Sequence, residues 1–423
     1  MMLKNRTVLP VKLILIVLIS YYCGLTDVIL PFIDERVFTF GGLIAVVFID
    51  LSILAKDLSI ARIKAFDCLY GFLFIGIICF CGIHTLVSGY ANSSQVLSYA
   101  ISCVLPILLL PLLYQIKDNG NAQYLWVDIF IGLVVASIIL RMLNCLAFEL
   151  AHTALFPKVL GVIRGGHITA RIYALDAVLF FIELYRGFNY YRITKTLNKD
   201  AYLCLLTIAF ITVFARGRMQ ILCVLISLIG FLLFQKFKSG DKALFVLVLS
   251  FLGIIFFLTP FAKDLMGTAS SASSDVLAVN YDGTLLFQGQ IDNTASVRLF
   301  TIKHGWEMME KDPSGTGLVY YGTPRFKAFF PIGSNDDLGY IGTIFTFGYV
   351  SVLFIVPLIL WGLIQSFRVR CQPMFQLRLS IVAYLVISGI SLSLFDLSRI
   401  AALPFFICLL SAESNNLISG DVY

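Results

Sequence analysis

A set of arginines that border apolar runs is the part of this sequence best suited to chemistry. Its members are Arg164, Arg171, Arg216, Arg218, Arg298, Arg325 and Arg399. A guanidinium group is a planar fork of donors that fits phosphate oxygens in pairs, so several at the depth of a membrane surface suit a lipid-linked phosphate or pyrophosphate. Any single one can instead bind a lipid headgroup or cap helix carbonyls. The set favours function, above all Arg216 and Arg218, which lie between two apolar runs.

Three other side chains are candidates for acid–base chemistry. His304 follows Arg298 and Lys303, and an imidazole titrates near neutral pH, so it is a candidate general base; the alternative is a surface histidine without a role. Asp336 and Asp337 open a predicted helix, where the helix dipole favours carboxylates. Helix capping explains one of these two, and a base or sugar-binding role is open for the other.

The composition indicates which elements must position these side chains. Hydrophobic residues make up 59% of the 423 residues and charged residues only 13%, whereas a soluble chain carries about 25% charged residues. Apolar runs recur along the chain, for example at 221–234, 243–257 and 349–364. A helix needs about 20 mostly apolar residues to cross a bilayer. The sequence therefore predicts an all-α, polytopic integral membrane protein.

We expect about twelve transmembrane helices from the number of such runs. They are placed at 8–26, 37–55, 66–88, 96–115, 124–148, 169–187, 201–215, 218–235, 243–262, 337–365, 377–395 and 398–412. The stretch 201–235 is too long for one helix, and Arg216-Gly217-Arg218 marks the turn between two. Arg141 falls inside a predicted helix near Asn144, where it either pairs within the bundle or reaches the membrane interface.

The distribution of basic residues orients these helices. With the N-terminus inside, the inward segments hold more than twice as many Lys and Arg residues as the short outward segments, so both termini are expected in the cytoplasm. The N-terminal apolar run lacks a small-residue cleavage site and is interpreted as a retained first helix. The expected domains are a membrane domain over 1–262, a large periplasmic loop over 263–336, a membrane domain over 337–412 and a cytoplasmic tail over 413–423.

Two outward segments are long enough to contain structure of their own. In the large loop, helical spacing over Val297, Phe300, His304 and Met308 predicts a helix, and a turn is expected over 312–317. The loop 149–168 is a candidate to dip into the membrane face.

Basic residues stand in short clusters between apolar runs, so the net charge of +6 does not indicate nucleic-acid binding. The ten cysteines fall mostly inside apolar runs, so we expect neither a disulfide framework nor a metal site.

Three segments carry a family resemblance. The first is FARGRMQIL (214–222), a helix–Arg-Gly–helix segment. The second is SVRLFTIKHGWEMMEKDPSGTGLVYYG (296–322), in which an arginine is followed by a Pro-x-Gly-x-Gly turn, and the third is NDDLGYIGTIFTFGYVSVL (335–353), which contains Asp-x-Gly-x-x-Gly and a later Phe-Gly. In this order, with a large outward loop between them, they resemble the O-antigen polymerase family, within the O-antigen polymerase/ligase superfamily of bacterial inner-membrane proteins.

The resemblance implies a metal-independent glycosyltransferase of the C type, without a cofactor. Such enzymes transfer a growing glycan from undecaprenyl pyrophosphate onto the next lipid-linked repeat unit at the periplasmic face. By position, Arg216, Arg218 and Arg298 would contact pyrophosphate. With two more outward arginines, the predicted pyrophosphate-binding residues are Arg164, Arg216, Arg218, Arg298 and Arg399, and the candidate catalytic residues are His304, Asp336 and Asp337. The expected partners are the undecaprenyl-pyrophosphate-linked oligosaccharide, the bilayer and a chain-length regulator protein, with no nucleic acid.

Other functions stay open beside the polymerase. A flippase or exporter of the lipid-linked unit should show two similar halves with short loops, and this chain has a long outward segment and no internal repeat. An O-antigen ligase typically carries a His-Asn pair before the helix that follows the large loop, where this chain reads Gly333-Ser334-Asn335-Asp336. A non-catalytic membrane scaffold is the remaining alternative. The polymerase is favoured, and the missing histidine leaves its general base unassigned.

Overall fold

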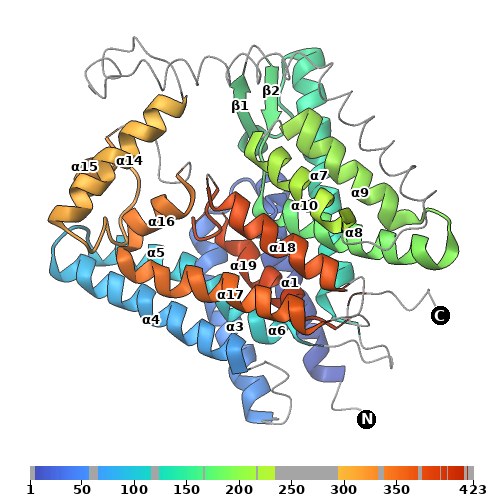
Figure 1. The fold of residues 1–423 in the computed structure, drawn as a ribbon, viewed down its shortest axis with the longest axis horizontal. Coiled ribbons are helices and arrows are strands. Elements are labelled where there is room, and N and C mark those ends of the chain that lie inside the picture. Colours follow the sequence, from blue (N-terminus) through green and yellow to red (C-terminus); the bar gives the residue numbers. More distant parts are fainter. Residues whose placement is uncertain are drawn as a thin grey trace.

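The fold is a bundle of helices around one large buried core (Figure 1). It is seen in a computed structural model that describes residues 5–56, 65–115, 123–164, 167–215, 218–233, 294–331, 338–369, 374–390, 392–397, 399–413 and 417. Within these residues one sheet is formed, an antiparallel hairpin of β1 (Leu160–Arg164) and β2 (His167–Ala170).

Four helices among the described residues are long and apolar enough to cross a membrane. These are Phe66–Val87 in α4 (Ala65–Val87), Ser93–Leu113 over α5 (Ser93–Leu108) and α6 (Leu110–Leu113), α7 (Trp126–Ala151), and Tyr349–Arg368 over η5 (Tyr349–Ser351) and α17 (Val352–Arg368). The shorter apolar helices belong to α1 (Asn5–Tyr22), α10 (Arg218–Leu233), α18 (Met374–Ser388), and η6 (Ile400–Ala402) with α19 (Leu403–Ser411).

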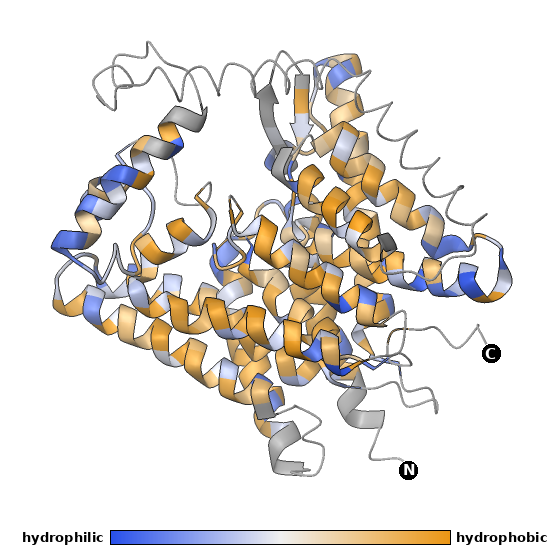
Figure 2. Cartoon of the chain, in the orientation of Figure 1, coloured by the Kyte–Doolittle hydropathy of each residue, from blue (hydrophilic) through white to orange (hydrophobic). Residues whose placement is uncertain are grey.

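The surface of the bundle is apolar as well as its core. Phe72 and Phe80 on α4 and Phe48 on α3 (Glu35–Lys56) are exposed. Figure 2 shows hydrophobic residues along α4 and α17, and hydrophilic residues on α14 (Thr294–Lys311) and α15 (Pro324–Phe329). Contiguous exposed apolar surface of this kind suits a lipid environment rather than water. The chain is therefore a membrane protein by composition, length of its helices and surface.

Among the remaining elements, α8 (Ala174–Thr194) lies in the core, since most of its residues are buried. The others are shorter: α2 (Leu25–Ile29), η2 (Pro157–Val159), α9 (Lys199–Ala209), η3 (Phe210–Ala215) and α16 (Gly339–Phe347). The first turn of α4 and the end of α19 meet at one end of the bundle, because the hydroxyl of Tyr114 bonds to both Asp67 and Ser411.

The other end of the bundle carries α14, α15 and the hairpin (Figure 1). Here the end of α4 meets the segment after α14, since the N–H of Leu318 donates to Thr85 Oγ1 at 2.9 Å. The start of α16 meets the end of α18, since the N–H of Tyr340 donates to the carbonyl of Gly389 at 2.7 Å. We refer to this as the α14 end of the bundle.

Several expected elements are confirmed and one is wrong. The division of 201–235 into two helical segments is confirmed, since η3 ends at Ala215 and α10 begins at Arg218, while residues 216–217, at which the turn was expected, lie outside the described residues. The single helix expected over 337–365 is wrong, because α16 stops at Phe347 and the chain turns at Gly348, with φ 75° and ψ −175°. The loop expected over 149–168 holds β1 and the start of β2, and its approach to the membrane face stays a prediction. The predicted helix 243–262 and much of the loop 263–336 lie outside the described residues.

Candidate functional site

The helix expected over Val297 to Met308 is confirmed as α14, and its histidine is held by a backbone carbonyl. The Nε2–H of His304 donates to the carbonyl of Ala328 in α15 at 2.8 Å, and its ring lies parallel to that of Phe300 with centroids 6.1 Å apart. A carbonyl only accepts, so this bond places the proton of neutral His304 on Nε2 and makes Nδ1 the basic nitrogen. The bond fixes the half-buried imidazole and leaves Nδ1 as the nitrogen that can accept a proton.

Arg298 lies on a different side of α14 from His304. Six residues separate them, which places their side chains about a third of a turn apart and about 9 Å along the axis. Arg298 is half-buried and in line with Gly305, where an added methyl group would lie 2.2 Å from the ring of Phe345 in α16. The helix therefore turns its arginine side toward α16 and its histidine toward α15.

The Pro-x-Gly-x-Gly turn after α14 is seated between α4 and the break that separates α16 from α17. The N–H groups of Thr316 and Gly317 donate to the carbonyls of Phe345 and Thr346 at 2.8 and 2.9 Å. The hydroxyl of Thr85 accepts from the next residue of the turn. These bonds satisfy backbone groups that are buried at the turn, so they fix its position against both helices.

Two glycines allow the turn and the helix break to approach each other. Gly315 and Gly348 both have positive φ, 74° and 75°. A methyl group on Gly315 would lie 2.5 Å from the carbonyl oxygen of Phe345, and one on Gly348 would lie 2.7 Å from that of Pro313. Any larger residue would therefore be strained in its backbone and would collide with backbone on the other side.

A polar cluster closes the turn on its other side. Arg325 donates to Asp312 and, at 2.6 Å, to the carbonyl of Gly315, while its guanidinium lies 4.1 Å from the centroid of the Tyr90 ring. Partial desolvation raises the pKa of Asp312, but hydrogen bonds from Ser314 and Tyr90 and the charge of Arg325 outweigh it and lower that pKa to about 2. Asp312 is thus a structural carboxylate. Arg325, one of the seven arginines singled out from the sequence, stabilises the turn through its bonds to Asp312 and Gly315.

The start of α16 lies against both α14 and α18. Asp336 and Asp337 are outside the described residues, but Leu338, which follows them, is 3% exposed. It shares a small hydrophobic cluster with Met309 and Phe345, against which Ile302 of α14 also packs. Leu338, the first described residue after the two predicted aspartates, therefore lies beside α14.

Arg399 is held by an ion pair at the same end. Its Nη1 lies 2.8 Å from Oδ2 of Asp396, whose side chain is buried. The segment after α18 that leads to this pair is tied to α16 by a hydrogen bond between Ser393 and Thr343. Arg399 thus lies on a segment adjacent to α16, with part of its charge already compensated by a carboxylate.

The other predicted arginines are placed through their backbone alone. Arg216 is outside the described residues, Arg218 is the first residue of α10, and Arg164 is the last of β1. The helix α10 packs along α18, and η3, which ends directly before Arg216, contacts both β2 and α10. The hairpin, the start of α10, the end of α18, the start of α16 and α14 are therefore successive neighbours.

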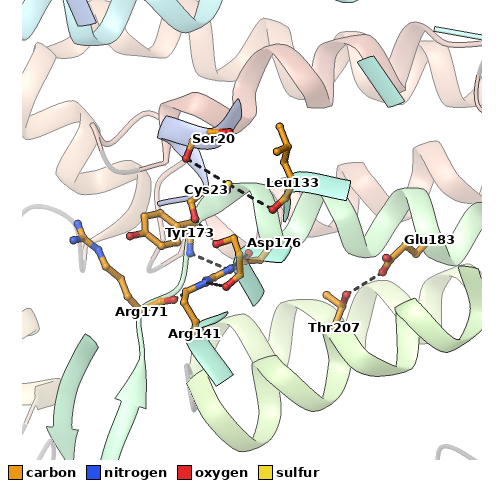
Figure 3. Close-up of polar contacts among 10 residues, drawn as sticks. Ser20, Cys23, Leu133, Arg141, Arg171, Tyr173, Asp176, Glu183 and Thr207 are labelled. Atoms are coloured by element: carbon orange, nitrogen blue, oxygen red, sulfur yellow. Dashed lines mark hydrogen bonds and ion pairs between the residues drawn. The ribbon is translucent and has the colours of Figure 1, made fainter. Parts of the chain in front are cut away.

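A buried ion pair supports this end from within the bundle (Figure 3). Arg141 Nη1 and Nη2 donate to the two carboxylate oxygens of Asp176 at 2.8 and 2.7 Å, and Nη1 also donates to the carbonyl of Arg171 at 2.7 Å. Of the two alternatives for Arg141, pairing within the bundle is confirmed, and its partner Asp176 was not predicted. The neighbouring Asn144 instead bonds the backbone of Phe156. The available signal was a carboxylate at the start of the next apolar run.

Among the described residues, no three His, Cys, Asp or Glu side chains converge in a way that could hold a metal ion. The independence from metals expected above stays a prediction. Neither a protein-family model nor a curated protein matches this sequence.

Proposed function

We propose that this protein is a polymerase of lipid-linked polysaccharide repeat units in the bacterial inner membrane. It would be a metal-independent glycosyltransferase of the C type with about twelve spans, its termini in the cytoplasm and its α14 end in the periplasm. It transfers the growing glycan from undecaprenyl pyrophosphate onto the next lipid-linked unit, and a chain-length regulator is its candidate partner.

The observation that carries this proposal is the adjacency of the elements that hold the candidate residues. The hairpin with Arg164, the start of α10 with Arg218, the segment of Arg399 and the helix of Arg298 follow one another around a single end of the bundle. Positive charge is normally depleted on the outer face of a membrane protein. Its concentration on contiguous elements supports a ligand that is anionic and lies at membrane depth.

The course of the chain supports the span number. The helix α10 runs away from the α14 end, since Phe231 near its end packs on Phe188 in the second half of α8 with ring centroids 5.3 Å apart. The chain returns at Thr294 at the α14 end. One further crossing, which the predicted helix 243–262 would supply, accounts for this change of side.

The proposed reaction is a displacement at the anomeric carbon of the donor glycan. A hydroxyl of the acceptor sugar forms the new C–O bond, the bond between that carbon and the pyrophosphate oxygen breaks, and undecaprenyl pyrophosphate leaves. Arg216, Arg218 and Arg298 stabilise the charge that develops on the leaving group. His304 takes the hydroxyl proton on Nδ1, the nitrogen left basic by its bond to Ala328. Asp336 and Asp337 are the alternative bases.

Reconstitution tests the proposal directly. The purified chain, supplied with lipid-linked repeat units from its source and excess chelator, should produce a ladder of longer glycans. A ladder that forms only after a divalent metal is restored would contradict the metal-independent chemistry. In a deletion strain, surface lipid capped with a single repeat unit is expected, because flipping and ligation belong to other proteins. Loss of even that single unit would identify a flippase or a ligase instead.

A further inference from the structure

Five side chains from distant segments gather beside the hairpin at the α14 end: Tyr21, Asp27, Arg171, Tyr173 and Tyr320. The hydroxyl of Tyr173 donates to Oδ2 of Asp27 at 3.4 Å, and the guanidinium of Arg171 lies 5.4 Å from the centroid of the Tyr173 ring. The carbonyl of Tyr21 accepts from the N–H of Gly24 at 3.1 Å, directly beneath the Tyr173 ring, and its hydroxyl interacts electrostatically with Asp27, Arg171 and Tyr320. We call these five residues the tyrosine patch.

The tyrosine patch is accessible. Arg171 is exposed, and the other four side chains are half-buried. Figure 3 shows Arg171 extending away from the buried pair of Arg141 and Asp176, with Tyr173 beside it. The patch therefore presents tyrosine rings and two opposite charges at the surface rather than in the core.

The patch is also held rigidly from beneath. Gly24, in the left-handed turn between α1 and α2, has φ 76°, and a methyl group there would lie 2.2 Å from the ring of Tyr173. That ring is therefore packed directly on the backbone of Gly24. On the other side, the hydroxyl of Tyr320 donates to Ser98 Oγ at 3.1 Å. A surface fixed before its ligand arrives loses little conformational entropy on binding.

The chemistry of the patch suits a sugar ring. Tyrosine presents an apolar face beside a hydroxyl, which matches a pyranose with its C–H face and its hydroxyl edge. Asp27 accepts hydrogen bonds from hydroxyls and Arg171 donates to ring or hydroxyl oxygens. Their charges balance, so the patch is a poor site for a phosphate or an acidic sugar. The patch is thus electrically balanced, whereas the neighbouring arginine-bearing elements carry the positive charge that an anion requires.

The buried side chain of Arg141 lies between the tyrosine patch and η3, the segment that precedes Arg216. The guanidinium of Arg141 lies 5.0 Å from the centroid of Tyr173 and 4.6 Å from that of Phe210, the first residue of η3. The segment η3 leads directly to Arg216. The tyrosine patch therefore lies beside the element that leads to Arg216.

We infer that the tyrosine patch binds a neutral sugar ring of the lipid-linked repeat unit. The inference rests on the proposed function, because that function supplies the glycan. It adds a sugar site that is separate from the pyrophosphate-binding arginines and from the candidate bases.

Binding of the repeat-unit oligosaccharide, released from its lipid, tests this on the purified full chain by saturation-transfer NMR. Tyr173→Ala and Asp27→Ala should each weaken binding about tenfold or more, since each removes a hydrogen-bonding group or a ring from the site. Tyr173→Phe keeps the ring and should give a smaller loss. Tyr202→Ala is the matched control, because Tyr202 is 60% exposed on α9, outside the patch. Unfolding temperatures equal to wild type would show that each variant is folded.

The outcomes separate the two proposals. Wild-type affinity in Tyr173→Ala and Asp27→Ala, with polymer still made by the wild type, would overturn the patch and leave the polymerase standing. Binding lost in both patch variants while the wild type makes no polymer would overturn the polymerase and leave the sugar site standing. Arg298→Ala should keep oligosaccharide binding and lose polymer. Equal loss of affinity in Tyr202→Ala would also overturn the patch.

Discussion

Arg141 and Asp176 form a two-pronged ion pair that joins α7 to the first turn of α8, with both side chains at most 1% exposed. Removing one partner of such a pair leaves an uncompensated buried charge and costs about 3–5 kcal/mol. Asp176→Ala should therefore lower the stability of the purified protein by this amount, and Arg141→Leu with Asp176→Leu should cost less than the sum of the single changes. A double-mutant cycle of unfolding free energies measures this. Glu310→Ala, on the exposed side of α14, is the control and should change stability by less than about 0.5 kcal/mol.

The approach of Gly315 to the helix break predicts a steric penalty. Gly315→Ala should cost about 1–3 kcal/mol more than Gly322→Ala, because only the first methyl group meets backbone atoms. Gly322 also has positive φ, 88°, and nothing lies within 4 Å of the added methyl group, so this control isolates the collision from the backbone strain. Thermal unfolding of the two purified variants gives the comparison. Equal destabilisation would show that the turn can move away from Gly348.

Arg298 should matter to chain extension and not to folding. A contact to a developing oxyanion is worth about 100- to 1000-fold in rate, so Arg298→Ala should nearly abolish the polymer, and Arg298→Lys should restore it in part because a point charge replaces a two-pronged donor. Arg216→Ala should behave in the same way. The control is Lys311→Ala, which removes an exposed positive charge from the same helix. A normal ladder from Arg298→Ala and Arg216→Ala at wild-type protein levels would refute the assignment.

The orientation of His304 separates a catalytic from a structural role. In His304→Gln, the side-chain amide can replace the Nε2–H and keep the bond to Ala328, but it offers no basic nitrogen. The variant should keep the wild-type unfolding temperature and lose polymerisation about 100-fold or more. His304→Ala should lose both activity and some stability. Full activity in His304→Gln would assign the histidine to structure alone and leave the base to Asp336 or Asp337.

The carboxylate of Asp312 should make the turn after α14 sensitive to acid only well below neutral pH. Its pKa is lowered from 3.8 to about 2. A carboxylate with a depressed folded-state pKa contributes its full stability above the unfolded value and loses it as the pH falls through the folded value. Asp312→Asn should therefore be less stable than wild type at pH 5–7, and the difference should narrow below about pH 4. A difference that is constant from pH 7 to pH 3 would contradict the assignment.

The helices that follow from apolar length alone were predictable from sequence. The spans expected at 66–88 and 124–148 correspond closely to α4 and α7, because the length of an apolar run is a local property. The break at Gly348 was not predictable in this way, since it depends on the carbonyl of Pro313, which packs against it from another segment. Apolar composition continues through the break, so hydropathy gives no signal there.

The candidate site stays a prediction, and its contacts did not follow from the sequence. Alternation of the helices predicts only that the arginine-bearing segments share one side of the membrane, whereas the adjacency of the elements that hold Arg164, Arg218 and Arg298 comes from packing. The roles of Arg325 and Asp312 depend on Tyr90, which is more than two hundred residues earlier in the chain. Such pairings arise from tertiary packing, and no periodicity or spacing in one sequence specifies them. The catalytic role of His304 and the pyrophosphate role of the arginines stay predictions.

The bonding partners of the Pro-x-Gly-x-Gly turn constrain the order in which the protein assembles during synthesis. The turn bonds to Thr85, synthesised long before it, and to the carbonyls of Phe345 and Thr346, synthesised after it. A nascent chain that ends before Phe345 has no acceptors for the N–H groups of Thr316 and Gly317. The bonds that hold this turn can therefore form only after α16 has been synthesised, although the partner Thr85 is made more than two hundred residues earlier.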